Sequence, residues 1–286
     1  MKRILFTGAT GFVGKNVIPM LKEKYEIFMP KRNALNLLDS CAVENYIIDN
    51  NIQIVIHAAN PNAVKNPLDS EDRMFKESLE MFMNFYRVQH LYEKMLYIGS
   101  GAEYDKCQEI ASVKESAIGI SVPKDDYGFS KYIMNELART SEKIYNLRLF
   151  ACYGPYDFYT KFITHAIRCC IRKEDLTIRQ DCWFDYLHVY DLAKTMIFFI
   201  ENTPMYHDYN VCSGRRIKLS QIAEEVIRQM NSSVKIVFGK EGMNNEYTAS
   251  NKRLSNEFQI QNPIRLEEGI QLQIQWEKKH YEEESC

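Results

Sequence analysis

The sequence predicts an α/β protein, built from a doubly wound parallel sheet and a smaller α/β lobe toward the C-terminus. An apolar strand pattern at the start runs into a glycine-rich turn and then a helix. Short apolar runs then alternate with helical patterns, and 286 residues are enough for two cores. We expect residues 1–152, with about 183–205, to form the sheet domain, and residues 153–182 and 206–286 to form the smaller lobe.

The first predicted strand, Ile4–Thr7, leads into a TGxxGxxG turn and a helix that ends at about Lys24. In this spacing Gly8 permits a tight turn, Gly11 lets the backbone approach a pyrophosphate, and Gly14 packs the helix against the strand. The N-terminal amides of the helix would then bind the phosphates. The turn therefore predicts a dinucleotide site of the Rossmann type, formed by Gly8, Thr10, Gly11, Phe12, Val13 and Gly14.

The second and third strands are expected near Glu26–Met29 and at residues 52–56. The third strand leads into Ala58 and Ala59, whose small side chains let the backbone lie close to a bound cofactor. These two alanines therefore join the predicted cofactor site.

Two cations, Lys31 and Arg32, follow the second strand, where an NAD-binding protein usually presents a carboxylate to the ribose. Cations at this place suit a ribose 2′-phosphate, so the predicted cofactor is NADP(H). The alternative is a solvated basic loop. Leu38 and Asp39 complete the predicted site, with Asp39 at the adenine.

A long helix is expected over residues 69–93, and the strand Met95–Ile98 then brings Ser100 to a carboxyl end of the sheet, where ligands bind in such folds. The polar segment 109–126 is expected to be a loop or flap. The charged residues 277–286 are expected to form a solvated tail.

Tyr127 and Lys131 lie four residues apart, one turn of a helix, so both would face the same side. The reference pKa of tyrosine is about 10, and we expect the lysine charge to lower it. Ser100 would hydrogen-bond a substrate carbonyl oxygen that Tyr127 protonates. The three residues predict a proton-transfer site, with Lys131 also contacting the cofactor.

The composition argues against several other classes of protein. The 36 basic and 38 acidic residues nearly cancel, so nucleic acid or an anionic membrane surface is not expected as a partner. The first apolar run is too short for a signal peptide or a membrane span, which predicts a cytoplasmic protein. The eight cysteines lack metal-ligand spacing, so we expect reduced thiols and no metal site.

The ordered motifs resemble those of the extended short-chain dehydrogenase/reductase family, the nucleotide-sugar epimerases, dehydratases and reductases. Within it the chain looks most like the GDP-fucose synthase group, on residues 30–40 and on residues 153–157 followed by His165. The resemblance rests on the turn at residues 7–14, His57-Ala58-Ala59, the strand end at Ser100, Tyr127–Lys131, and residues 153–155, 185–192 and 210–214.

This resemblance implies NADPH-dependent reduction of the C4 ketone of a nucleotide-linked 4-keto-6-deoxy sugar, expected to be a GDP-linked hexose or heptose. Gly101 and Ala102 stand where dehydratases carry an acid and a base, so dehydration is not expected. Ala102 also replaces a cysteine that pairs with the histidine corresponding to His165, so 3,5-epimerase activity is not expected. His165 would serve as a substrate partner or be a surface histidine.

Two alternatives use the same residues. One is a C4 epimerase that keeps NAD(P) tightly bound, and the other is a non-catalytic NADP-sensing protein. An intact set of Ser100, Tyr127 and Lys131 argues against the second.

The smaller lobe is expected to bind substrate, but the phosphate anchor is not obvious. Phe184 occupies a position where the family commonly has an arginine. The expected substrate-binding residues are Ser100, Gly101, Ala102, Tyr127, His165, Arg179 and Phe184, and the candidate anchors are Arg168, Arg172, Arg179 and Arg215.

A homodimer is also expected, through the helix at 69–93 and the helix that carries Tyr127. The apolar residues that would form this face are Met74, Phe75, Met81, Phe82 and Phe85, which also suit a helix packed in the core.

Overall fold

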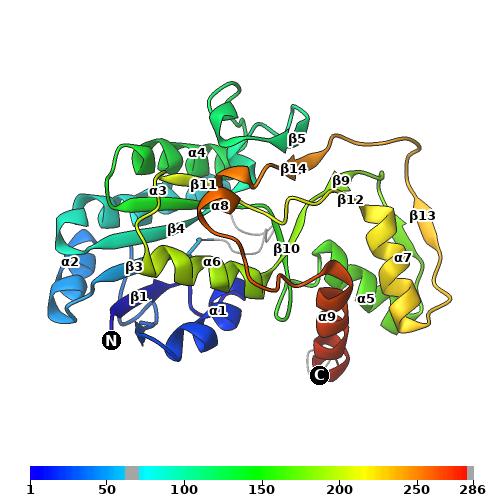
Figure 1. The fold of residues 1–286 in the computed structure, drawn as a ribbon, viewed down its shortest axis with the longest axis horizontal. Coiled ribbons are helices and arrows are strands. Elements are labelled where there is room, and N and C mark those ends of the chain that lie inside the picture. The colour runs from blue at the N-terminus through cyan, green and yellow to red at the C-terminus, as the bar shows by residue number, and fades with distance from the viewer. Residues whose placement is uncertain (62–70, 282–286) are drawn as a thin grey trace.

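The computed structural model describes residues 1–61 and 71–281, and its centre is a six-stranded parallel sheet (Figure 1). The expected α/β fold is confirmed. The order of strands across the sheet reverses between β1 and β3, and ligands bind at such switch points in doubly wound folds. The strands, in spatial order, are β2 (Glu26–Phe28), β1 (Arg3–Thr7), β3 (Ile54–His57), β4 (Lys94–Ser100), β6 (Ile144–Leu149) and β11 (Asp208–Val211).

Helices cover both faces of this sheet (Figure 1). On one face α1 (Phe12–Lys22) packs against α6 (Val189–Glu201). On the other face lie α2 (Ser40–Asp49), α3 (Glu71–Arg87) and α4 (Asp126–Arg139). Each face buries an apolar core, which is the requirement for a doubly wound sheet.

The smaller lobe has its own core among α5 (Phe162–Arg172), α7 (Leu219–Met230) and α9 (Leu266–His280). A four-stranded sheet beside it joins β12 (Ile217–Lys218), β9 (Trp183–Phe184), β14 (Tyr247–Ala249) and β5 (Ile110–Val113). Two more strand pairs are β7 (Ala151–Tyr153) with β10 (Tyr186–His188) and β8 (Leu176–Ile178) with β13 (Ile236–Phe238), and the last short α-helix is α8 (Lys252–Glu257). Short 3-10 helices lie at Gln89–Leu91, Gly101–Glu103 and Glu115–Ala117.

The sequence assigned residues 206–286 to the smaller lobe, but β11 within this range belongs to the central sheet. β11 pairs with β6 at the sheet edge, whereas β9 and β10 near residue 183 belong to smaller sheets. The segment 109–126 is also more ordered than a loop. It contains β5, and Glu115 is buried there because its carboxylate accepts the N–H of Asn210 at 2.9 Å.

Residues 277–286 were expected to form a solvated tail, but this segment begins inside a helix, and its first residue is buried. α9 continues to His280, and the Glu277 side chain is only 1% exposed. Its carboxylate pairs with Arg168 of α5 at 2.7 Å. A charge that looks solvated in the sequence thus joins two helices, while residues 282–286 lie outside the described part of the chain.

The face expected to form a dimer is in part the protein's own core. Met81, Phe82 and Phe85 are buried, and Phe75 stacks on Phe129 of α4 with ring centroids 5.5 Å apart. The expected helix start at residue 69 lies outside the described residues. The homodimer therefore stays a prediction. Over residues 1–61 and 71–281, no helix has both the length and the apolar character needed to cross a membrane.

Candidate active site

Ser100 ends β4 and caps a short turn over Gly101–Glu103. Its hydroxyl accepts the N–H of Ala102 at 3.1 Å, while the Glu103 carboxylate accepts the N–H of Ser100 at 3.0 Å. This reciprocal pair is a capping box, which satisfies two backbone donors and fixes the turn. Sequence reasoning missed Glu103, although the Ser-x-x-Glu spacing was a usable signal.

A buried charge network lies directly beneath this turn. Glu103 and Arg148 form an ion pair of 2.6 Å, and both side chains are 0% exposed. Asp208 contacts the same guanidinium at 3.2 Å, and Asn146 donates to Glu103 at 2.9 Å. A Cβ at Gly99 would overlap Asn146 and Glu103, so this position requires glycine. The network therefore holds the strand end that carries Ser100.

Helix α4 brings Tyr127 and Lys131 to the same place. Asp125 caps the helix by accepting the N–H of Gly128 at 2.9 Å, and Lys131 donates to the carbonyl of Ile98 on β4 at 2.9 Å. A Cβ at Gly128 would lie 2.6 Å from the carbonyl oxygen of Ala102, so the first turn of α4 packs directly on the turn that follows Ser100. The three residues expected to be catalytic are thus gathered at the carboxyl end of β4.

The electrostatics of this cluster differ from the sequence-based expectation. Burial raises the pKa of Tyr127 by more than the Ser100 side chain lowers it, so the net shift runs opposite to the lowering expected from Lys131. Burial also lowers the pKa of Lys131 to about 8, against the opposing effect of the Glu103 charge. The phenol is therefore a group that stays protonated near neutral pH, suited to donating a proton.

The turn between β1 and α1 fits a dinucleotide. Gly8 has φ +74°, and a Cβ there would lie 2.7 Å from the backbone of Ala58 and Ala59. A Cβ at Gly14 would lie 2.5 Å from the carbonyl of Ala9. Gly11 begins α1 without a side-chain cap, which leaves the first amides of the helix for an anion. Only glycines allow this close cradle at the switch point of the sheet.

The residues expected at the adenosine end lie beside this cradle. Lys31 and Arg32 are exposed in a turn after β2, which is the neighbour of β1. Half-buried Leu38 precedes Asp39, whose carboxylate accepts the N–H of Ala42 at 3.0 Å and caps α2. The expected contact of Asp39 with adenine stays a prediction beside this structural role.

The expected substrate residues are more dispersed. Gly101 and Ala102 are buried in the turn after Ser100, and Phe184 is half-buried in β9. His165 lies on α5 with its Nε2 3.6 Å from Cys169 Sγ, and burial lowers the pKa of this histidine. Arg179 is exposed after β8. Among the described residues, no hydrogen bond or ion pair joins His165 or Arg179 to Ser100, Tyr127 or Lys131, and their roles stay predictions.

The candidate phosphate anchors divide into two groups. Arg168 pairs with Glu277 and Arg172 pairs with Glu174, each at 2.7 Å. Arg179 and Arg215 have exposed side chains. Arg172 is also exposed but is paired with Glu174, so Arg179 and Arg215 stay the candidates with no ion pair among the described residues.

Two further residues reach the catalytic cluster from outside its motifs. A Cβ at Gly101, the residue after Ser100, would lie 2.3 Å from the Tyr247 phenol oxygen, so this phenol packs on the same turn. The Lys106 ammonium lies 5.9 Å from the centre of the Tyr127 ring. No spacing in the sequence links these positions to Ser100 or Tyr127.

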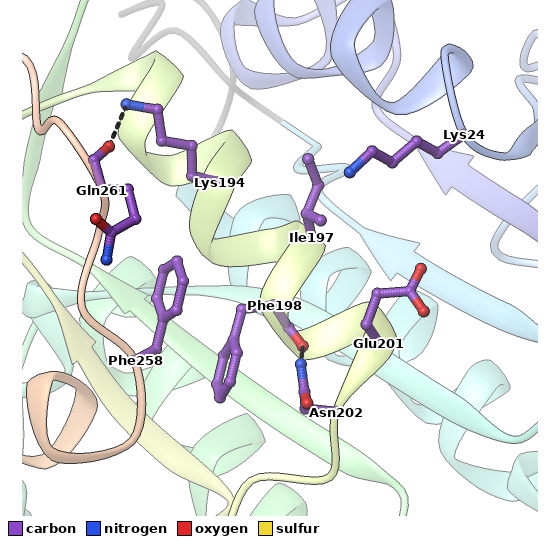
Figure 2. Close-up of a pocket in the computed structure, with 8 residues that line it drawn as sticks. All are labelled: Lys24, Lys194, Ile197, Phe198, Glu201, Asn202, Phe258 and Gln261. Atoms are coloured by element: carbon purple, nitrogen blue, oxygen red, sulfur yellow. Dashed lines mark hydrogen bonds between the residues drawn. The ribbon is translucent and has the colours of Figure 1, made fainter.

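A separate hollow lies along α6 (Figure 2). Phe198 and Phe258 stack within it at 4.7 Å, and Lys194 donates to the carbonyl of Gln261 at 3.3 Å. None of the residues expected at the cofactor or substrate site lines this hollow. We therefore assign it no part in the candidate site.

Comparison with known proteins places this site in context. Residues 4–212 match the model of the NAD dependent epimerase/dehydratase family. The chain is similar to the GDP-L-colitose synthase of Yersinia pseudotuberculosis, with 23% identity over 301 residues, 96% of this chain and 97% of that protein.

Solved structures share the fold. A GDP-L-fucose synthetase from Naegleria fowleri, bound to NADP, superposes with a TM-score of 0.84 and 19% identity, over 98% of this chain and 94% of the other. A GDP-mannoheptose C4 reductase from Campylobacter jejuni, with NADP bound, gives a TM-score of 0.82 and 17% identity, over 97% and 98% of the two chains. These likenesses cover the sheet and the smaller lobe together.

Proposed function

Since this chain belongs to the NAD dependent epimerase/dehydratase family, we propose that it reduces the C4 ketone of a nucleotide-linked 4-keto-6-deoxy sugar with NADPH. The observation that carries the proposal is the cluster of Ser100, Tyr127 and Lys131 at the carboxyl edge of the sheet that also bears the glycine cradle. In this proposal the sheet domain binds the cofactor and the smaller lobe binds the sugar nucleotide.

The roles of the three residues follow from their chemistry. A bound nicotinamide would supply the hydride. Tyr127 donates its proton to the ketone oxygen, and Ser100 donates a hydrogen bond to the same oxygen. Lys131 binds the nicotinamide ribose and places its positive charge beside the phenol. The raised pKa of Tyr127 keeps the proton on the phenol until charge develops on the oxygen.

The side chains around Ser100 support reduction over dehydration. Gly101 and Ala102 carry no transferable proton, and both oxygens of Glu103 are engaged beneath the turn. Ala102 also leaves His165 without the cysteine partner expected of a 3,5-epimerase. These features support a reductase without epimerase activity.

The substrate class is supported by the relatives. The colitose synthase, fucose synthetase and mannoheptose reductase all carry GDP in their names. We therefore propose a GDP-linked hexose or heptose for this chain.

A panel assay tests the proposal. Purified protein is given NADPH, and NADH in parallel, with 4-keto sugars on GDP, UDP, dTDP and CDP, and nicotinamide absorbance is followed. We expect stoichiometric NADPH oxidation with a GDP-linked substrate. Interconversion of C4 epimers without net oxidation, by protein that carries bound nicotinamide, would favour the epimerase instead.

The pH dependence of the reaction should reflect Lys131. Its pKa is lowered to about 8 by burial, so the ammonium loses its proton as pH rises through 8, earlier than an ordinary lysine. Tyr127 stays protonated there because its own pKa is raised. We expect kcat/KM for reduction to be level below about pH 7.5 and to fall through pH 8 to 9. A profile that stays level to pH 9.5 would contradict this assignment.

Cofactor choice should depend on Lys31 and Arg32. Replacing both with serine removes the cations proposed to bind the 2′-phosphate, and charged hydrogen bonds are worth about 1.5–3 kcal/mol each. We expect the Kd for NADPH, measured by fluorescence titration, to rise at least about tenfold while the Kd for NADH changes little. Lys22→Ser, at an exposed site on α1, is the control. An equal rise in Kd for NADPH and NADH would show that Lys31 and Arg32 do not bind the 2′-phosphate.

A further inference from the structure

Phe184 lies on a strand between the two parts of the chain. It belongs to β9, which pairs with β12 on one side and with β14 on the other. Figure 1 shows β9 and β14 between the central sheet and α7. The side chain is half-buried, although phenylalanine is among the residues most often fully buried in proteins. An apolar ring thus stays partly open to solvent at the junction of the two lobes.

The neighbours of Phe184 are tyrosine rings that are also half-buried. Its ring centroid is 5.5 Å from that of Tyr247 on β14 and 5.7 Å from that of Tyr186 on β10. Tyr247 in turn contacts the buried ring of Phe150, with 5.1 Å between the centroids. We call Phe184, Tyr186 and Tyr247 the aromatic wall.

The aromatic wall begins at the catalytic turn. A Cβ at Gly101, the residue after Ser100, would lie 2.3 Å from the Tyr247 phenol oxygen and 2.9 Å from a ring carbon of Phe150. The C4 ketone of the proposed substrate must lie at Ser100 and Tyr127. The sugar ring, rather than the nucleotide, is therefore the part of the substrate nearest to this wall.

The position of Phe184 is fixed through its neighbour in the chain. Asp185 is 1% exposed, and its carboxylate accepts the N–H groups of Ser213 and Gly214, each at 2.7 Å. Successive side chains of an extended chain point to opposite sides, so these bonds hold the segment on the side away from Phe184. The wall is thus in place before a ligand binds, which lowers the entropy cost of binding.

We propose that the aromatic wall binds the sugar ring of the substrate and selects sugars that lack a 6-hydroxyl. The inference rests on the proposed reduction, because that chemistry places the sugar at Ser100. Aromatic rings pack well against the C–H bonds of a pyranose and against the methyl group of a 6-deoxy sugar. A 6-hydroxyl packed on the Phe184 ring would lose water and gain no hydrogen bond from it, which is unfavourable. Phe184 is the specificity-determining residue, since its ring contacts both tyrosines.

A binding experiment tests the wall without turnover. Dissociation constants are measured by calorimetry for GDP-D-rhamnose and GDP-D-mannose, which differ only in the 6-hydroxyl, and for GDP. The pair UDP-6-deoxyglucose and UDP-glucose is measured in parallel with UDP. In the pair that binds, we expect the 6-deoxy sugar to bind about tenfold more tightly, since an apolar surface rejects an added hydroxyl only moderately.

Two substitutions of Phe184 test the source of this preference. Phe184→Gln places a polar amide in the wall and should reduce the preference to less than about twofold. Phe184→Leu keeps an apolar side chain but loses the flat ring, so both sugars should bind about threefold more weakly while the preference remains. Both variants should bind the nucleoside diphosphate within about twofold of the unmodified protein, because it lacks the sugar.

Phe198→Gln is the matched control. Phe198 is another half-buried phenylalanine that contacts an aromatic ring, that of Phe258, and it lies in the hollow along α6. This variant should leave every dissociation constant unchanged. Circular dichroism checks the fold of each variant, and Phe184→Leu provides the test if Phe184→Gln does not fold.

The possible failures are distinguishable. Equal binding of both sugars by the unmodified protein, a preference that survives in Phe184→Gln, or unchanged sugar binding in Phe184→Leu would overturn the role of the wall. A protein that prefers the 6-deoxy sugar but oxidises no NADPH with any 4-keto sugar would keep the wall and overturn the proposed reduction. Absence of binding by both pairs would overturn both.

Discussion

Replacing Tyr127 with phenylalanine should lower kcat for ketone reduction by about 10²- to 10⁴-fold, the usual contribution of a positioned proton donor. The change removes one oxygen and leaves the ring on α4. Because Lys131 still donates to the carbonyl of Ile98, the cofactor side of the site should keep its shape. We therefore expect the Kd for NADPH to change less than twofold.

Stopped-flow or steady-state NADPH oxidation measures this loss, and Tyr132→Phe on the same helix is the matched control. The ring of Tyr132 stacks on that of Phe129, with centroids 6.5 Å apart, and has no part in the proposed catalytic cluster. Its variant should therefore keep full activity. Turnover of Tyr127→Phe within threefold of the unmodified protein would exclude the phenol as proton donor. It would also favour the alternative that this chain is a non-catalytic NADP-sensing protein.

Replacing Arg148 with methionine should destabilise the protein by about 3–5 kcal/mol, the usual cost of removing one partner from a buried ion pair. Glu103 would be left as a buried carboxylate without its cation, while Asp208 would keep only its pairing with Arg253. Since Glu103 accepts the N–H of Ser100, the strand end should also loosen and activity should fall.

Urea unfolding followed by circular dichroism measures the change. Arg139→Met is the matched control, because Arg139 pairs with Glu136 at 3.2 Å on the surface of α4. Such exposed pairs contribute about 0–1 kcal/mol, so this variant should unfold close to the unmodified protein. Equal, small effects of the two variants would show that the buried network is not a major source of stability.

The sequence predicted the parts of the fold that local patterns specify. The glycine turn, the apolar runs of β1 and β3, and the four-residue step from Tyr127 to Lys131 are all read from neighbouring residues. Ser100 was placed correctly at the end of β4 because a strand and a small-residue turn adjoin there.

Other features depend on pairings between distant segments. β11 contains Asp208 and Asn210, polar residues that do not read as a buried strand, and both are buried because they bind Arg148. Glu277 looked solvated because its partner Arg168 lies on another helix. The Tyr247 phenol reaches Gly101, the residue after Ser100, through the register of β14 beside β5 and β9. Sequence periodicity carries no information on such pairings.

The most direct test of the central claim is the reaction in D₂O with NADPH and a GDP-linked 4-keto-6-deoxy sugar, with the product analysed by NMR. A C4 ketone reductase without epimerase activity predicts net NADPH oxidation, a protium from the cofactor at C4, and no deuterium at C3 or C5. Deuterium at C3 or C5, or product formed with no net oxidation of NADPH, would contradict it.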